Sequence, residues 1–292
     1  MLEEHEVKKL IMAGDVVKRA LRLAEGLVRP GASVLRIAEE IEGYMRELGA
    51  EPAFPANIGV NEVAAHYTPL PGDRSTIPDG SVVKVDVGAH VDGYIADAAI
   101  TVSLNPALEG LVEATREALS RALEAVRPGA RAYEVGARVE EVAKSMGFRP
   151  VRNLSGHSIG RYSIHGGRSI PNYKDVLARW KFEEGVYAVE PFLTSGEGVV
   201  VEAPLITIHA LTGEPRSEDF LISLWRERRT LPFAVRWYAS RGLENVAASL
   251  ERARRSRKLV DYPVLVERGR GPVAQFEHTV VLVGREVIVT TA

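Results

Sequence analysis

Apolar residues recur at helical spacing in four stretches of the chain, and these stretches form two pairs. The predicted helices cover residues 3–27, 34–48, 106–126 and 131–146. Pro30-Gly31 follows the first helix and prevents its continuation. Ser33 is a favourable N-cap for the second, and Gly49 and Gly147 suit the left-handed position that ends the second and the fourth.

A short motif repeats between the two pairs of helices. The sequence Val-Arg-Pro-Gly-Ala at residues 28–32 recurs at 126–130, and the glycines that end the following helices keep the same offset of 98 residues. Strand-like segments at 80–86 and 185–190 extend the parallel. These matches predict two related halves that face each other, with a shared site that draws acidic side chains from both.

Residues 209–271 break this symmetry. Three short helices, a strand and an arginine-glycine turn are predicted there, over residues 217–228, 232–239, 243–255, 262–267 and 268–271. Three small helices followed by a β-hairpin resemble a winged-helix insertion. The sequence therefore predicts an α+β fold in which residues 1–208 and 272–292 form the main domain and residues 209–271 form the insertion.

The composition excludes several classes of protein. The 292 residues include no cysteine, which excludes disulfide scaffolds and thiolate metal sites. Lysine and arginine total 37 against 39 aspartates and glutamates, too balanced for the whole chain to act as a nucleic-acid polyelectrolyte. The acidic start lacks the features of a signal peptide, and no apolar run approaches the roughly 18 residues of a membrane span, so we expect a soluble cytoplasmic protein without membrane contact.

One basic concentration lies within the insertion. It comprises Arg252, Arg254, Arg255, Arg257 and Lys258, with Arg268 and Arg270 on the expected wing. A winged helix invites a nucleic-acid interpretation, yet a solvated helix face is the more common origin of such a pattern. No specific nucleic-acid partner is therefore predicted, and a transient contact with the ribosome is kept as a hypothesis.

The clearest local signal is a predicted hairpin of residues 82–91 and 94–102, joined by an Asp-Gly dipeptide that suits a type I′ turn. This turn places Asp97 opposite Gly88 and Asp86 opposite Ala99. The two carboxylates then project from one face as diagonal neighbours, roughly 7–8 Å apart at the backbone. Gly88 leaves room between them. If these acids are considered alone, a hairpin face that points to solvent explains them equally well. If the face points into the protein, the two buried charges require neutralisation, for which a divalent cation is the natural explanation.

Further metal-ligand types occur in similar positions. Glu190 ends a strand-like segment, Glu277 lies on one face of the strand pattern 273–283 with Gln275 and Thr279, and His157 follows Ser-Gly. With the hairpin acids they make four carboxylates and one imidazole. Such a set suits Mn, Fe(II), Co or Zn, and four negative charges are balanced by two divalent ions. Two such ions form the hydrolytic arrangement that activates a water and polarises a carbonyl.

Several longer motifs follow in order along nearly the whole chain. They are Pro-Ala-Phe-Pro at 52–55, Asn-Glu-Val-Ala-Ala-His-Tyr-Thr-Pro at 61–69, the aspartate hairpin, Leu-Ser-Gly-His-Ser-Ile at 154–159, Ile-His-Gly-Gly at 164–167, Val-Glu-Pro-Phe at 189–192, Thr-Leu-Pro-Phe-Ala at 230–234 and Gln-Phe-Glu-His-Thr at 275–279. Together they resemble the type 2 methionine aminopeptidases, in particular their archaeal form, which have a two-halved pita-bread fold. Several ordered motifs make this resemblance more specific than any single pattern.

The resemblance implies a role for each matched residue. The dinuclear metal ligands would be Asp86, Asp97, His157, Glu190 and Glu277, with Asp97 and Glu277 shared by both ions. The matched catalytic residues are His66 and His165. Glu190, as a ligand able to relay a proton, is our expected third catalytic residue, first as general base and then as acid. The methionine pocket would comprise Phe54, Ile164, His165 and Tyr262. The implied activity is removal of the initiator methionine from peptides and nascent proteins with small second residues, by attack of a metal-activated hydroxide.

Two alternative functions remain open at this point. A proline-specific dipeptidase uses the same fold and similar ligands, but such relatives place an extra domain before the catalytic one. A non-catalytic pita-bread protein would bind a partner instead, which the complete ligand set disfavours. His66 and His165 have no metal-like spacing of their own, so their catalytic role rests on the resemblance.

Overall fold

The computed structural model describes residues 2–215 and 218–292. Its long helices fall where the apolar spacing predicts them: α1 (Glu4–Leu27), α2 (Val34–Glu47), α3 (Glu109–Ala125), preceded by the short 3-10 helix η1 (Pro106–Leu108), and α4 (Ala132–Ser145). The hydroxyl of Ser33 accepts a hydrogen bond from the Arg36 amide and caps α2. Gly49 and Gly147 have left-handed φ values of 84° and 82°, so the second and fourth helices end in the same way.

The strands form four sheets. In the first, β4 (Val82–Val91) pairs with β1 (Glu51–Pro52), β2 (Asn57–Val60) and β5 (Tyr94–Ser103). The second has the order β16 (Glu286–Val289), β15 (His278–Val283), β9 (Gly185–Val189), β7 (Ser155–Ile159) and β8 (Ser169–Pro171). The third is β14 (Val273–Gln275), β10 (Phe192–Thr194) and β6 (Arg149–Pro150). The fourth is β12 (Phe233–Ala234), β11 (Val200–Leu211), β13 (Leu259–Glu267) and β3 (Val63–Ala65).

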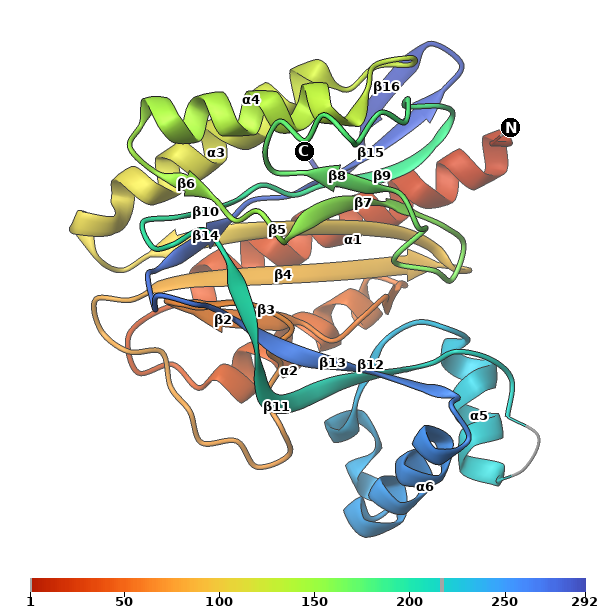
Figure 1. The fold of residues 1–292 in the computed structure, drawn as a ribbon. Helices are drawn as coiled ribbons and strands as arrows, with labels where there is room; N and C mark the ends of the chain where they lie inside the picture. Colours follow the sequence, from red (N-terminus) through yellow and green to blue (C-terminus); the bar gives the residue numbers. More distant parts are fainter. Residues whose placement is uncertain (1, 216–217) are drawn as a thin grey trace.

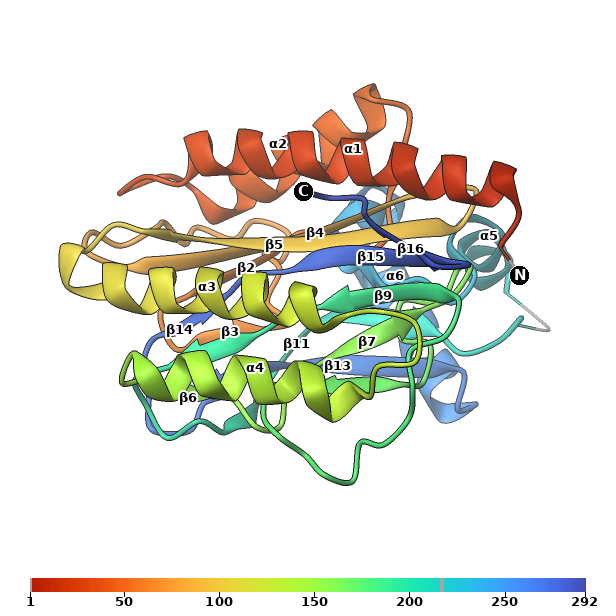
Figure 2. The same cartoon turned by 90° about the horizontal axis from the view of Figure 1, so that it is seen from above.

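Both pairs of helices lie on the outer side of the sheets. Figure 1 shows α3 and α4 above the strands and α1 behind them, and Figure 2 shows the same layers from above. One apolar core joins α1 and α2 to the β4–β5 hairpin and contains Val17, Ile41 and Val85. A second core joins α3 and α4 to strands of the other half and contains Leu111 and Val280. The strand faces that point toward the helices are therefore apolar, and the faces that point away from them, toward the centre of the molecule, are available for polar side chains.

The β4–β5 hairpin has the predicted register. Asp86 lies opposite Ala99, and Gly88 lies opposite Asp97. Both residues of the Asp-Gly turn have positive φ, of 51° and 84°, as a type I′ turn requires. The two aspartates therefore project from one face of the hairpin.

Three predictions for the last part of the chain were wrong. Residues 273–283 do not form one strand, because β14 and β15 belong to different sheets and Glu277 lies between them. Residues 232–239 are not one helix, since β12 is followed by the 3-10 helix η2 (Val235–Arg241). The turn at 268–271 closes no hairpin, because β13 pairs with β11 and β3, whereas β14 pairs with β10.

The remaining helices form a group at one side of the molecule (Figure 1). α5 (Asp219–Arg228), η2 and α6 (Leu243–Arg255) lie in the chain between β11 and β13. The predicted helix start at Ser217 falls outside the described residues. The group has its own small core, formed by Leu211, Leu221, Leu224, Phe233, Tyr238, Val246, Leu250 and Ala253. The domain limits at 209 and 271 stay a prediction.

Ion pairs neutralise much of the basic concentration at the end of α6. They are Arg252–Glu218, Arg254–Glu251, Arg254–Asp261 and Arg255–Glu251. Lys258 also donates to the carbonyl oxygen of Glu214. This pairing favours a solvated surface over a surface prepared for phosphate groups.

Candidate active site

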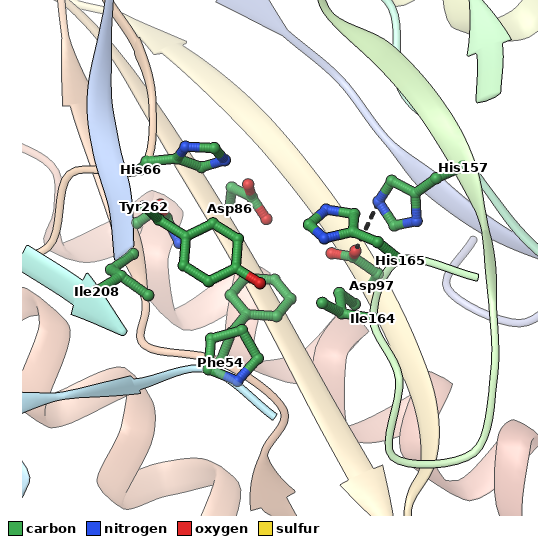
Figure 3. A pocket seen from close by; sticks show the side chains of 11 residues that line it. Phe54, His66, Asp86, Asp97, His157, Ile164, His165, Ile208 and Tyr262 are labelled. Carbon is green, nitrogen blue, oxygen red and sulfur yellow. Dashed lines mark ion pairs between the residues drawn. The ribbon is translucent and has the colours of Figure 1, made fainter. Parts of the chain in front are cut away.

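The five side chains expected as metal ligands converge between the two halves. Asp86 lies on β4, Asp97 on β5 and His157 on β7, while Glu190 directly follows β9 and Glu277 connects β14 to β15. Ligand atoms of Asp97, His157 and Glu277 all lie within 4.8 Å of one another. His157 Nε2 lies 3.2 Å from Glu190 Oε1 and 3.8 Å from Asp97 Oδ2, the contact drawn in Figure 3. The fold therefore brings acids from distant parts of the chain to one centre.

Two neutral polar side chains hold these acids in place. The Gln275 Nε2 group lies 3.4 Å from Asp86 Oδ2 and 3.3 Å from Glu277 Oε2 and donates to both. The Thr279 hydroxyl accepts from the amide of Asp97 and donates to its carbonyl oxygen, both at 2.7 Å. The sequence pattern placed Gln275 and Thr279 on the face of Glu277, but their bonds to the hairpin could not be read from it.

The four carboxyl groups are buried together, and this is costly without a cation. Burial raises the pKa of Asp97, Glu190 and Glu277 well above the usual range. Burial, followed by the charge of Glu190, raises the pKa of Asp86 to about 8. Among the described residues, no hydrogen-bond partner reaches the buried atoms Asp86 Oδ1, Asp97 Oδ1 and Glu277 Oε1. Unpartnered acceptor atoms that meet at one centre are what a bound metal ion satisfies.

The orientation of His157 leads to the same conclusion. Its Nδ1 lies 3.4 Å from the carbonyl oxygen of Ser158, so a neutral ring donates there and keeps a free lone pair on Nε2. Burial lowers the pKa of His157 to about 4, which leaves the ring neutral at pH 7. The Nε2 lone pair then faces oxygens of Glu190 and Asp97, and these atoms repel unless a proton or a cation lies between them. The donor set fits a divalent ion such as Mn, Fe(II), Co or Zn.

A cavity opens onto Asp86 and Asp97, while Glu190 and Glu277 lie behind its lining. It is lined by Phe54, Asn57, His66, Asp86, Asp97, His157, Ile164, His165, Ile208, Pro232 and Tyr262. All four pocket residues expected from the resemblance are present, and Figure 3 shows them grouped beside the aspartates. Sequence reasoning missed Asn57, Ile208 and Pro232. Ile208 could have been found only from the pairing of β11 with β13, which sets it opposite Tyr262.

His66 enters the cavity in an unusual backbone conformation. Its φ is 65°, a left-handed value that is uncommon outside glycine. Its Nδ1 lies 3.2 Å from the carbonyl oxygen of Pro263, so the neutral ring donates there and keeps Nε2 as an acceptor. Burial, and then the nearby His165, lowers the pKa of His66 to about 4. Burial, and then His157, lowers the pKa of His165 to about 3. Both rings are therefore neutral at pH 7.

Phe54 occupies the space opposite Asp97. A Cβ on Gly88 would lie 2.3 Å from Phe54 Cε1, so the expected empty space at Gly88 is filled by this ring. That expectation was wrong because a distant loop covers the hairpin. The buried guanidinium of Arg228 donates to the carbonyl oxygens of Ala53 and Pro232 and so ties two sides of the cavity together.

Besides the exposed His5, three further histidines lie outside the cavity lining. His90 Nδ1 accepts from the Gly93 amide at 3.1 Å, which supports the hairpin turn. His278 Nδ1 lies 2.9 Å from a threonine hydroxyl near the C-terminus. His209 Nδ1 lies 2.6 Å from Asp261 Oδ1, on the strand pair that leads to the helical group. These contacts give each ring a structural partner.

Known proteins resemble the chain along almost its whole length. The family model for metallopeptidase family M24 matches residues 8–283. The chain belongs to this family. A Pyrococcus abyssi protein named methionine aminopeptidase is 44% identical over 293 residues, which cover 98% of this chain and 99% of that protein. The resemblance to archaeal methionine aminopeptidases that the motifs carry is thus confirmed.

Solved structures share the fold. A methionine aminopeptidase from Thermotoga maritima superposes with a TM-score of 0.74 at 24% identity, over 99% of this chain and 98% of that one. A thermophilic Arx1 superposes with a TM-score of 0.85 at 18% identity, over 99% and 91%. The M24 chain therefore has the predicted pita-bread fold. Within residues 2–215 and 218–292, no helix is long and apolar enough to cross a membrane.

Proposed function

We propose that this M24 peptidase removes the N-terminal methionine from peptides and nascent proteins whose second residue is small. The observation that carries the proposal is the cavity in which a cluster of buried, unpartnered carboxylate oxygens adjoins an apolar pocket. A peptidase needs the carboxylate cluster to hold the ions that activate water, and it needs the apolar pocket to select the side chain of the first substrate residue. The full-length relatives named methionine aminopeptidase support the choice of methionine.

Two divalent ions are proposed for the acidic centre. Asp86, Asp97, His157, Glu190 and Glu277 would hold them, because four carboxylates carry the charge that two such ions balance. Bound ions would supply Lewis-acid polarisation of the peptide carbonyl and would make a water more acidic. Mn, Fe(II), Co and Zn all suit this mixture of oxygen and nitrogen donors.

Three residues at the centre have separate proposed roles: Glu190 transfers protons, and His66 and His165 form hydrogen bonds to the substrate. Glu190 is buried with a raised pKa, so it can accept a proton from the attacking water and deliver it to the departing amine. His66 Nε2 is an acceptor, so it orients the substrate by receiving an N–H group. His165 is neutral and lies with its ring centroid 4.7 Å from that of His157, close enough to the centre to donate to the scissile carbonyl oxygen.

The apolar part of the cavity suits an unbranched thioether. Phe54, Ile164, Ile208 and Pro232 offer carbon surfaces, and the Tyr262 ring stands edge-on to His66 at 5.5 Å between centroids. A charged first residue would lose its hydration there without gaining a partner. The preference for methionine therefore follows from apolar fit.

A second cavity continues from the first. It shares Ile164, His165 and Tyr262 with the catalytic cavity and extends over Ser163, Ala210, Leu211, Thr212, Thr230 and Val260. Among the described residues that line this second cavity, none carries a charge at pH 7, because the ring of His165 is neutral there. This continuity supports an exit path for the later residues of an extended peptide.

The test is methionine release by the purified, metal-loaded protein. Peptides Met-Ala-Ser, Ala-Ala-Ser and Met-Pro are compared by chromatography, with the metal-free protein as control. The proposal expects release from Met-Ala-Ser only, and only with metal present. Cleavage of Met-Pro without cleavage of Met-Ala-Ser would replace it by a proline-specific dipeptidase.

We also propose that the protein works in the cytoplasm, where nascent chains become available. A transient ribosome contact through the basic residues 252–258, at the end of α6 and just after it, stays a hypothesis, which the ion pairs of Arg254 and Arg255 weaken. Co-sedimentation with ribosomes tests it with an Arg255→Glu, Arg257→Glu double variant. Equal co-sedimentation of variant and wild type removes the hypothesis, and loss in the variant supports it.

A further inference from the structure

A buried threonine holds the backbone of His66. The Thr207 hydroxyl on β11 donates to the carbonyl oxygen of His66 and accepts from the amide of Thr68, both at 3.2 Å. Thr207 is fully buried, so water cannot take over either bond. One hydroxyl thus fixes the two peptide groups on either side of Tyr67.

The contact continues from Thr68 to the helical group. Arg236 on η2 donates through Nη1 to the Thr68 hydroxyl at 2.7 Å and to the Pro69 carbonyl oxygen at 3.2 Å. Its Nη2 pairs with the carboxylate of Glu42 on α2. The side chains of Arg236 and Glu42 are only 4% and 3% exposed. Buried hydrogen bonds from Arg236 therefore hold Thr68 and Pro69, the segment that follows His66.

Glu42 extends the same network to the apolar wall of the cavity. Its carboxylate accepts from the Ala56 amide at 2.9 Å and from Trp237 Nε1 at 2.7 Å. The Thr68 hydroxyl donates to the carbonyl oxygen of Ala56 at 2.7 Å. Ala56 stands next to Asn57 in the cavity lining. Among the described residues no partner reaches the buried Nε of Arg236, but its two other nitrogens are bonded, and each side chain of the network makes at least one hydrogen bond. The hydrogen bonds therefore couple the cavity wall to the helical group.

The conformation of His66 explains why such a network is needed. A histidine at φ 65° is strained, and such residues persist only where the surroundings impose the conformation. The Pro263 carbonyl oxygen fixes the ring at Nδ1, but it does not fix the backbone. Thr207 and Thr68 supply that second constraint.

We propose that Thr207, Thr68 and the Glu42–Arg236 ion pair are positioning residues that hold His66 in its working orientation and connect it to the helical group. The inference rests on the role of His66 in the proposed function. Neither threonine lines the cavity, so both act through His66.

The test replaces Thr207 by valine, which keeps the shape and removes both hydrogen bonds. Thr207→Ser keeps the hydroxyl, and Thr115→Val is the matched control, because Thr115 is an equally buried threonine in α3 whose hydroxyl donates within its own helix, to the carbonyl oxygen of Leu111. For Thr207→Val, we expect kcat for Met-Ala-Ser to fall by about 10–100-fold, as expected for a misplaced catalytic group, with unchanged metal content and a KM within about threefold. The two other variants should stay within about threefold of wild-type kcat.

A second measurement does not depend on activity. Hydrogen exchange of the Thr68 amide should accelerate at least about tenfold in Thr207→Val, because that amide loses its acceptor, while exchange in α3 stays unchanged. Wild-type kcat in Thr207→Val, or an equal loss in Thr207→Ser, would overturn the proposal. If the wild type releases no methionine, the proposed function fails. The hydrogen-exchange measurement still tests the positioning network in that case, because an unchanged exchange rate of the Thr68 amide in Thr207→Val would refute it. If Thr207→Val does not fold, Arg236→Lys takes its place in the test, because lysine keeps the charge but loses the planar guanidinium group. The proposal then requires that kcat falls in Arg236→Lys.

Discussion

Replacing Gly88 by alanine tests how closely the cavity is built around the acids. Gly88 lies opposite Asp97, and the added Cβ would lie 2.3 Å from Phe54 Cε1. Carbon atoms pack at about 3.5–4.0 Å, so the ring must move by at least about 1 Å. Phe54 is a cavity wall, and its displacement narrows the space proposed for the methionine side chain.

The expected loss in kcat/KM for Met-Ala-Ser is about 10²-fold, because a displacement of about 1 Å in a positioning group has an effect of this size. It corresponds to about 2.7 kcal/mol of transition-state stabilisation. Overpacking should lower the free energy of unfolding by about 1–3 kcal/mol. Steady-state kinetics, metal analysis and denaturant unfolding measure these three quantities, and metal content should stay at the wild-type value.

A compensating change separates crowding from other causes. The double variant Gly88→Ala, Phe54→Leu provides space for the new methyl group, so its kcat/KM should exceed that of Gly88→Ala by at least about tenfold. Wild-type kcat/KM in Gly88→Ala would refute the packing argument. Failure of the double variant to recover, with metal content intact, would refute the role of Phe54 as the displaced group.

Three further predictions concern the proposed chemistry. His66→Ala should lower kcat by about 10²–10⁴-fold with unchanged metal content, and full activity in that variant would refute its role. The metal-free protein should lose stability as pH rises from 7.5 to 8.5, because its buried carboxyls have raised pKa values and hold protons that the unfolded chain has released. Above pH 7.5 the buried histidines are neutral in the folded protein and almost neutral in the unfolded chain, so they contribute little to the pH dependence of stability. Lys84, whose pKa burial lowers to about 7, opposes the carboxyls, but it is one group against several. Thermal unfolding of the metal-free protein across this window measures the change, and a flat profile contradicts the prediction. Peptides with N-terminal norleucine should be cleaved within about tenfold of methionine peptides, since the apolar cavity discriminates weakly between similar side chains, and complete rejection of norleucine would show a specific sulfur contact.

Local signals in the sequence predicted the parts of the fold that depend on neighbouring residues. The Asp-Gly turn sets the register of the β4–β5 hairpin, so the positions of Asp86 and Asp97 follow from counting. Ser33, Gly49 and Gly147 mark helix ends through their own side chains or φ values. Such features need no knowledge of distant partners.

Features set by distant partners could not be predicted. The chain from 273 to 283 has one continuous alternation, yet it changes sheets at Glu277 because β10 and β9 supply different edges. Phe54 covers Gly88 although the two lie on separate segments. The pairing of Glu42 with Arg236 joins residues from α2 and η2, and no spacing signal connects them.

Metal binding by the wild type and by Asp97→Asn tests the central claim most directly. Isothermal titration calorimetry of metal-free protein with Mn²⁺, supported by elemental analysis, gives the number of bound ions. Asp92→Asn is the matched control, because Asp92 is an exposed aspartate in the turn of the same hairpin. We expect two equivalents for the wild type and for Asp92→Asn, and a clear loss for Asp97→Asn. Equal binding by the wild type and Asp97→Asn, or no binding by either, would contradict the proposed dinuclear centre.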